Sequence, residues 1–126
     1  MKYILLISTL MFSSGSWAEW TAVAGAFHGS STNYVDFERI RKVNGLVYYW
    51  TITDYLEPPP GGHVSAKLYL KVDCELLRQW VLSFTTYKLR MAEGYGETLS
   101  PDPDPQWQYA QPDSTLEAML LAVCAH

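Results

Sequence analysis

Two cysteines, Cys74 and Cys124, constrain the fold of this 126-residue chain more than any other feature, because the chain has no others. Both lie downstream of an N-terminal segment that is typical of export signals, so we expect them to meet an oxidising compartment. A catalytic or metal-binding pair would normally be closer in sequence or accompanied by further ligands. The sequence therefore predicts one structural disulfide that joins two distant parts of the chain.

Residues 1–18 predict a signal peptide. Lys2 precedes an apolar run that ends near Phe12, and small residues lead to a cleavage point after Ala18. A membrane-spanning helix needs roughly 20 apolar residues, which is more than this run offers. No cysteine follows the run to carry a lipid, so we expect an exported product without a membrane span or lipid anchor. Its location would be the periplasm, the cell surface or the periphery of the outer membrane, and residues 19–126 would form one domain.

Charge argues against a general nucleic-acid binder. After the predicted cleavage the chain carries eight basic and 13 acidic side chains, a net charge of −5, whereas phosphate neutralisation needs a clustered positive surface. Arg39, Arg41 and Lys42 form the only basic cluster, and on a strand Arg39 and Arg41 would share a face. This cluster is either a solvated strand edge or a site for an anion or glycan.

Alternation of polar and apolar residues predicts a sheet. Asn44-Gly45 between two apolar runs is typical of a hairpin turn, because both positions tolerate positive φ. A turn is expected at 30–33, and the strand at 78–88 should place Trp80, Leu82 and Phe84 on one face. The strands are expected at 20–27, 34–41, 46–53, 63–74 and 78–88, with a turn or short edge strand at 91–96 and a short strand at 107–110.

The C-terminal segment changes to a helical period. Its apolar residues recur at three- and four-residue spacings and form one stripe. Ser114 and Glu117 match a capping box at its start. The stripe consists of Leu116, Met119, Leu120, Val123 and Cys124, so a disulfide from Cys124 would attach the end of this helix to the sheet.

Enzymatic function is not expected. His28, His63 and His126 have no neighbouring ligands at metal-binding spacing. The chain also contains no Gly-x-Ser-x-Gly motif, and Gly61-Gly62 lacks the strand-to-helix context of a phosphate-binding loop. The sequence therefore predicts neither a cofactor nor a metal site.

A set of short motifs resembles the bacterial surface-adhesin protein E-like domain family across essentially the whole exported chain. The motifs are Trp20, Tyr34-x-Asp36, Trp50 with Asp54-Tyr55, Ser65-x-Lys67, Asp73-Cys74, Tyr87 with Met91 and Gly94, Trp107, Pro112-Asp113-Ser114 and Cys124. The resemblance implies an α+β fold, in which a twisted antiparallel β-sheet of about five to six strands packs with a C-terminal α-helix held by one disulfide. It also implies no catalysis. The adhesin member of the family forms dimers and binds host matrix or plasma proteins such as vitronectin, laminin and plasminogen, so a homodimer and a host protein partner are among the expectations.

Our leading hypothesis is an exported binding module of Gram-negative bacteria that recognises a protein partner through the sheet face or its loops. The excess of aromatic residues without catalytic groups favours this hypothesis. An alternative is a soluble periplasmic inhibitor or immunity-type protein that acts on an enzyme or toxin. The candidate contact residues, which we expect to face outward, are Arg39, Arg41, Lys42, Tyr49 and Tyr69.

Overall fold

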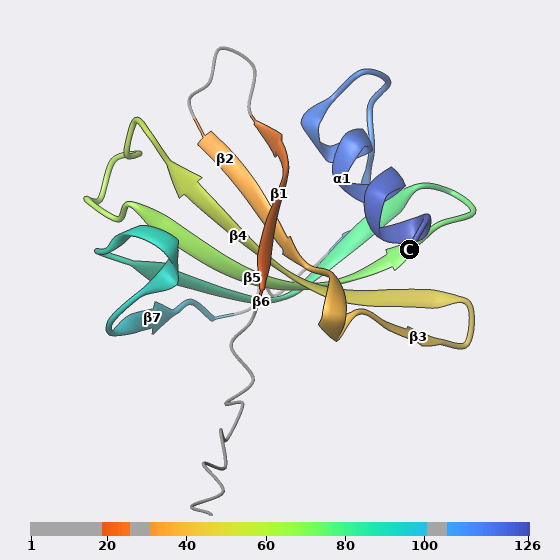
Figure 1. The fold of residues 1–126 in the computed structure, drawn as a ribbon, viewed down its shortest axis with the longest axis horizontal. Helices are drawn as coiled ribbons and strands as arrows, with labels where there is room; N and C mark the ends of the chain where they lie inside the picture. Colours follow the sequence, from red (N-terminus) through yellow and green to blue (C-terminus); the bar gives the residue numbers. More distant parts are fainter. Residues whose placement is uncertain (1–18, 26–30, 101–105) are drawn as a thin grey trace, which may run out of the picture.

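An antiparallel sheet forms one layer of the protein, and helix α1 (Thr115–Cys124) packs against one face of it (Figure 1). The computed structural model describes residues 19–25, 31–100 and 106–126, so the predicted signal peptide lies outside the described residues. The sheet has eight strands in the order β1-β2-β4-β5-β6-β7, with β3 pairing with β4 and β8 pairing with β6. The strands are β1 (Trp20–Gly25), β2 (Ser31–Asp36), β3 (Arg41–Val43), β4 (Leu46–Tyr55), β5 (Ser65–Asp73), β6 (Arg78–Tyr87), β7 (Gly96–Thr98) and β8 (Gln108–Tyr109).

The predicted α+β class is confirmed, but the sheet has more strands than the five to six expected. The short strands account for the difference, since β3 and β7 have three residues each and β8, which falls within the short strand predicted at 107–110, has two. Segments of this length are too short to show an alternating pattern in the sequence. They form because a longer neighbour, β4 or β6, offers them backbone partners.

The turn predicted at 30–33 was wrong for the described residues 31–33, which begin β2, and the strand predicted at 34–41 is present only as far as Asp36. The polar side chain of Asn33 finds hydrogen-bond partners on both neighbouring strands, so this polar segment can form a strand. Asn33 Nδ2 donates to the carbonyl of Ala24 at 3.2 Å, and Thr53 Oγ1 donates to Asn33 Oδ1 at 2.8 Å. The chain then forms the 3-10 turn η2 (Phe37–Arg39), in which Arg39 pairs with Asp36 three residues earlier. Arg39 and Arg41 are consequently on different elements.

The Asn44-Gly45 hairpin is confirmed. Asn44 has φ 51° and Gly45 has φ 80°, as a type I′ turn requires, and the flanking residues Val43 and Leu46 pair across β3 and β4. This turn therefore sets the register of β3 on β4.

A bulge between β5 and β6 changes which residues share a face. Tyr69 pairs with Ser83 but Leu70 pairs with Val81, so Leu82 is the extra residue. The prediction that Trp80, Leu82 and Phe84 lie on one face was therefore wrong: Trp80 pairs with Lys71, whereas Phe84 pairs with Leu68 on the opposite face. A single inserted residue inverts the alternation beyond it.

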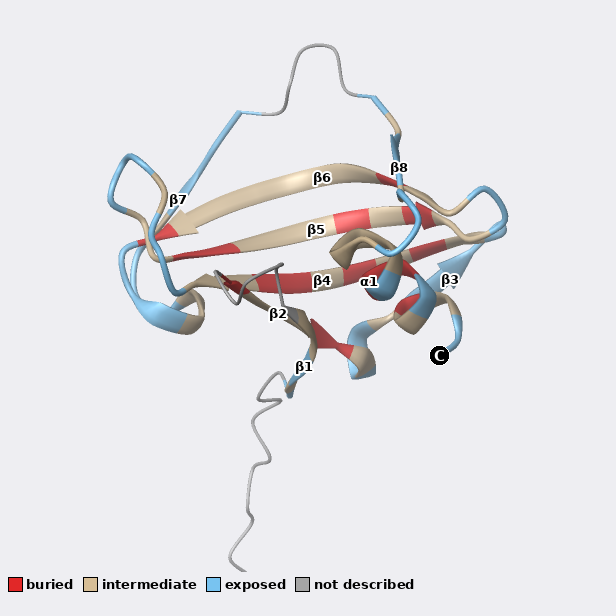
Figure 2. Cartoon of the chain, turned by 90° about the horizontal axis from the view of Figure 1, so that it is seen from above, coloured by how far each residue is buried: buried red, intermediate tan, exposed pale blue. Residues whose placement is uncertain are grey.

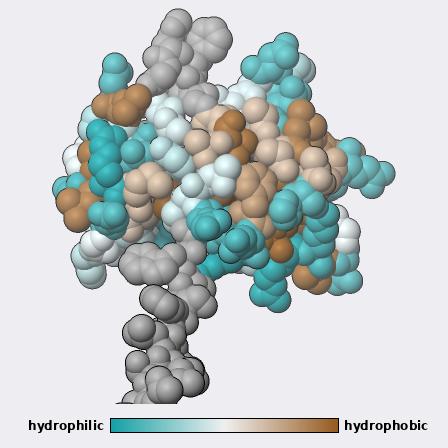
Figure 3. All heavy atoms as spheres, viewed as in Figure 1, coloured by the Kyte–Doolittle hydropathy of each residue, from teal (hydrophilic) through white to brown (hydrophobic). Residues whose placement is uncertain are grey.

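The core lies between α1 and the sheet. Figure 2 shows buried stretches on β4 and β5, some of them beneath α1 and others toward the end of the sheet near β7. The buried members of this core are Val35, Val47, Tyr49, Leu70, Val72, Met119, Leu120 and Val123. On the side of the molecule seen in Figure 3, apolar residues gather most densely on the half where α1 packs, with hydrophilic residues around them.

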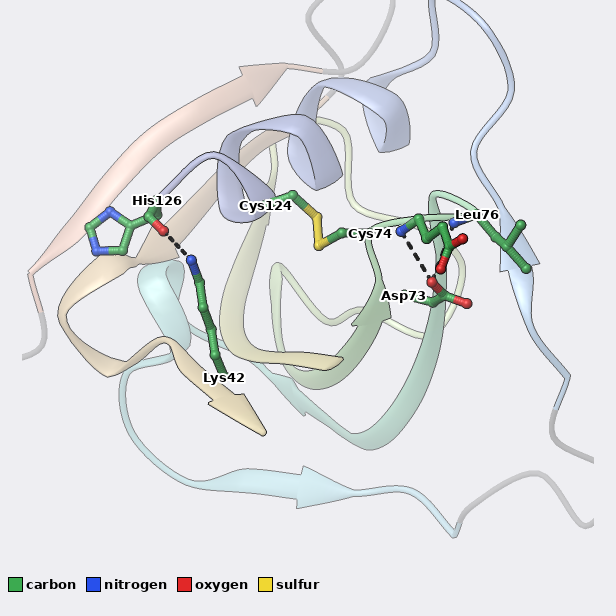
Figure 4. Close-up of a disulfide and its surroundings, with 7 residues drawn as sticks. Lys42, Asp73, Cys74, Leu76, Cys124 and His126 are labelled. Atoms are coloured by element: carbon green, nitrogen blue, oxygen red, sulfur yellow. Dashed lines mark hydrogen bonds between the residues drawn. A yellow bond between two sulfur atoms is a disulfide. The ribbon is translucent and has the colours of Figure 1, made fainter. Parts of the chain in front are cut away.

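Helix α1 begins as the capping pattern predicts. The Ser114 hydroxyl accepts from the amide of Glu117 at 3.1 Å, and the Glu117 carboxylate accepts from the amide of Asp113 at 3.2 Å, one residue before the cap. At its other end, Cys124 forms the predicted disulfide with Cys74, which follows β5 directly (Figure 4). The helix is thus attached to the sheet by a covalent bond as well as by apolar packing.

Candidate functional site: the aromatic face of the sheet

The sheet face opposite α1 is rich in aromatic and basic side chains. They share this face because the β4–β5 and β5–β6 registers pair Trp50 with Tyr69 and Lys71 with Trp80. We call this surface the aromatic face and define it by Tyr48, Trp50, Lys67, Tyr69, Lys71, Arg78, Trp80, Trp107 and Tyr109. Helix α1 leaves it uncovered, since α1 packs on the other face, and the 3-10 helix η3 (Arg90–Ala92) packs against β4 and β5 at the end of the face near Trp50 and Lys67.

The aromatic rings contact one another across the strands. Trp50 stacks on Tyr69 with ring centroids 4.5 Å apart, and Tyr48 lies on the other side of Tyr69 at 6.2 Å. Further along the face, Trp80 and Trp107 meet edge to face at 5.4 Å. Most of these rings are half-buried, so they are held in fixed positions yet keep surface available for a partner.

Basic side chains lie over these rings. Lys67 Nζ is 5.6 Å from the centroid of Trp50, and Lys71 Nζ is 4.9 Å from that of Trp80. The aliphatic stems of such lysines cover apolar surface while their ammonium groups stay near water. The contacts also bring positive charge and aromatic rings together, and the aromatic residues are of the types that are enriched where proteins bind one another.

Arg78 fixes one end of the face. Its guanidinium carbon lies 4.2 Å from the ring centroid of Trp107, its Nε donates to Asp73 Oδ2 at 3.0 Å, and its Nη1 donates to the Tyr109 hydroxyl at 3.1 Å. Although desolvation acts in the opposite direction, hydrogen bonds from the Leu76 amide, Arg78 and the Glu75 amide hold the pKa of Asp73 below its usual value. Asp73 is therefore ionised at neutral pH and orients Arg78.

The predicted contact residues do not form one cluster. Tyr69 lies at the centre of the aromatic face. Arg41 is on the same face because it pairs with Tyr48, and its side chain is exposed. Lys42 points to the other side of β3, where its Nζ donates to the His126 carbonyl at 2.5 Å (Figure 4). Arg39, on η2, lies near the β2 edge of the aromatic face and pairs with Asp36.

The expected outward orientation of Tyr49 was wrong. Its side chain is 1% exposed and belongs to the core under α1, and burial raises the pKa of its hydroxyl well above the usual value. Tyr48 and Tyr49 are adjacent on β4 and must face opposite ways. Both faces of this strand carry aromatic residues, so alternation alone did not identify the face that α1 covers.

Sequence reasoning also missed most of the aromatic face. Lys67, Tyr69 and Lys71 alternate along β5 and therefore lie on one face, which was a usable signal. Trp80 could not be added to them because the bulge at Leu82 was not foreseen. Trp107 joins the face only through tertiary contacts with Trp80, Lys71 and Arg78.

The described residues, 19–25, 31–100 and 106–126, also bear on two other kinds of site. No group of three or more His, Cys, Asp and Glu side chains is placed to hold a metal ion within these ranges. Within the same part of the chain, no helix has the length and apolar character needed to cross a membrane.

In the described part of the chain, a single sheet layered with one α-helix and joined to it by a disulfide defines a small domain of the α+β class. The chain belongs to the surface-adhesin protein E family, whose model matches residues 20–125. The sequence-based recognition of this family is thereby confirmed, and membership supports an exported surface adhesin. Among curated proteins no relative is found.

Solved structures of Haemophilus influenzae protein E share this fold. Its crystal form II is 18% identical, with a TM-score of 0.60, and the match covers 86% of this chain and 97% of the other. The selenomethionine form is 17% identical with a TM-score of 0.59, covering 85% and 95%. Protein E from the non-typeable bacterium is 18% identical with a TM-score of 0.58, covering 82% and 75%. At these identities the likeness concerns the fold.

Proposed function

We propose that the protein is a non-enzymatic surface adhesin that binds a host matrix or plasma protein through its aromatic face. The observation that carries this proposal is the row of half-buried rings and basic side chains on the sheet face that α1 leaves uncovered. Family membership supplies the adhesin class.

The chemistry of the face agrees with a protein partner. Aromatic residues and arginine contribute most to binding energy at protein interfaces, especially where they are held rigidly. Here Trp50 is stacked on Tyr69, and Arg78 is fixed by Asp73, so little side-chain entropy is lost on binding. The positive charge of the face, on a chain with excess acidic residues, favours an acidic surface on the partner.

Two adjacent residues of β3 provide a matched test. Arg41 is on the aromatic face and Lys42 on the opposite one, and both are exposed. Binding to immobilised vitronectin, laminin and plasminogen would be measured for wild type, Arg41→Glu, Tyr69→Ala and the control Lys42→Glu. We expect the first two variants to weaken binding to the partner and the control to bind as wild type. Equal loss in Arg41→Glu and Lys42→Glu, or no loss in Tyr69→Ala, would contradict the proposal.

Location provides an independent test. The protein on intact cells would be treated with protease, beside cells whose outer membrane has been opened. Digestion on intact cells is the expected result for a surface adhesin. Protection until the outer membrane is opened would contradict surface adhesion and favour a partner inside the envelope, such as an enzyme or toxin.

A further inference from the structure

A cavity of about 190 Å³ opens at the β2 edge of the aromatic face. Drug-sized ligands occupy sites of roughly 300–1,000 Å³, so this cavity has room for a single amino-acid side chain. Trp20 and Trp50 contribute aromatic walls, and Ile52 is among the apolar residues that line it. The complete lining consists of Trp20, Asp36, Arg39, Trp50, Ile52, Lys67, Met91 and Ala92.

The cavity is lined by one acidic and two basic side chains. Asp36 is 1% exposed, and its Oδ2 lies 3.3 Å from Arg39 Nε. Neither oxygen of Asp36 accepts a hydrogen bond from a described residue, so this ion pair is the interaction that offsets burial of the carboxylate. Asp36 therefore holds the guanidinium of Arg39, whose side chain remains 51% exposed, at the mouth of the cavity.

Lys67 supplies the second positive charge. Its Nζ lies between two rings, 5.6 Å from the centroid of Trp50 and 5.9 Å from that of Tyr87. Among the described residues no acidic side chain forms a salt bridge with Lys67. Since the charge of Asp36 is engaged by Arg39, the cavity has an uncompensated positive charge beside apolar walls.

We propose that this cavity binds a carboxylate of the protein partner, with Arg39 and Lys67 contacting its oxygens and Trp50 and Ile52 contacting the aliphatic part. Two cations from different elements can donate charge-assisted hydrogen bonds to one carboxylate. The size of the cavity suits a glutamate side chain or a chain terminus. This inference rests on the proposed function, because it names the chemistry that the aromatic face recognises at its β2 edge.

Short peptides test the cavity without the partner. The ¹⁵N-labelled protein would be titrated with acetyl-Gly-Glu-Gly-amide, its glutamine analogue, its lysine analogue and acetyl-Gly-Gly with a free C-terminal carboxylate. We expect the indole N–H resonances of Trp20 and Trp50 to shift with a carboxylate peptide and to stay unchanged with the glutamine and lysine analogues. Tighter binding of acetyl-Gly-Glu-Gly-amide would identify a glutamate side chain as the source of the carboxylate, and tighter binding of acetyl-Gly-Gly would identify a chain terminus. Equal shifts with the glutamine analogue, or binding of the lysine analogue instead, would overturn the proposal.

Lys67→Met and Lys71→Met form a matched pair. Both lysines are on β5 and lie over aromatic rings, but only Lys67 lines the cavity, and methionine retains most of the aliphatic stem. We expect Lys67→Met to weaken carboxylate binding roughly tenfold, the factor for one charge-assisted hydrogen bond, and Lys71→Met to leave it unchanged. Equal effects of the two substitutions would refute the site.

The two proposals can fail separately. If the peptides do not bind but Tyr69→Ala still weakens capture of the partner, the carboxylate site is wrong and the aromatic face remains the binding surface. If the peptides bind but Arg41→Glu and Tyr69→Ala leave capture unchanged, the cavity is a carboxylate site and the proposed role of the face is wrong.

Discussion

Removal of the disulfide should destabilise the protein without changing its fold. Cys74 and Cys124 are 50 residues apart, and a cross-link of that span lowers the entropy of the unfolded chain by an amount worth about 4 kcal/mol at 25 °C. Domains of this size have a free energy of unfolding of roughly 5–15 kcal/mol. Replacing both cysteines by serine should therefore remove a large part of the stability and lower Tm by roughly 15–20 °C.

Apolar packing should keep the helix in place after the substitution. Met119, Leu120 and Val123 are 4%, 0% and 0% exposed, and burial of each contributes about 1.5–3 kcal/mol. We therefore expect the double variant to retain the circular dichroism spectrum of wild type in the absence of denaturant.

Urea unfolding at pH 7 would compare oxidised wild type, wild type with reductant, and the double variant with and without reductant. The midpoint should fall in the second and third samples by similar amounts, and reductant should not affect the variant. Coincident midpoints for oxidised and reduced wild type would refute the entropic argument. Loss of helical signal in the folded variant would show instead that the disulfide, and not the apolar stripe, holds α1.

Four further substitutions, at three positions, test the core and one ion pair by urea unfolding. Gly96→Ala should destabilise by about 1–3 kcal/mol, because its Cβ would lie 2.6 Å from the Tyr87 ring; an unchanged midpoint would contradict this. Tyr49→Ala should lower the free energy of unfolding by about 3–5 kcal/mol, because the Tyr49 side chain is buried. Tyr49→Phe should lower it by less than about 1 kcal/mol, because the hydrogen bond from the Tyr49 hydroxyl to Gln79 is long, at 3.4 Å. Equal losses in the two variants would contradict burial of the ring. The folded state holds the pKa of Asp73 below its usual value, so its contribution is present at pH 7 and lost as pH falls through that lowered pKa. Asp73→Asn should therefore be less stable than wild type at pH 7, with a difference that shrinks as the pH is lowered, and a difference that stays constant across an acid titration would contradict this.

Local patterns predicted the elements whose structure depends on near neighbours. The Asn44-Gly45 turn, the Ser114 cap and the apolar stripe of α1 all form as expected, because φ preference, capping and helical spacing act within a few residues. The start of β2 was not predicted, since Asn33 is held by bonds to Ala24 and Thr53 on neighbouring strands. A polar run can be a turn or a strand, and only its partners distinguish them.

The candidate site depends on longer-range geometry than the elements do. The sequence identified Tyr69 and Arg41, which lie on the aromatic face, but also Tyr49, which is buried. It gave no indication of the cavity, because Trp20, Asp36 and Lys67 come from three separate strands. Pairing across the sheet brings these residues together, and no local pattern encodes that pairing.

The sequence by itself determined the family, through the order of its short motifs, and it determined the class of the fold and the covalent link between Cys74 and Cys124, because motif order, periodicity and cysteine count are properties of the chain alone. The tertiary structure decided which face of the sheet α1 covers, and with it which aromatic residues remain available to a partner. Both faces of β4 carry tyrosine, so their local preferences are equivalent. Packing of Met119, Leu120 and Val123 on Tyr49 and its neighbours removes that equivalence by burying one face and leaving the other for binding.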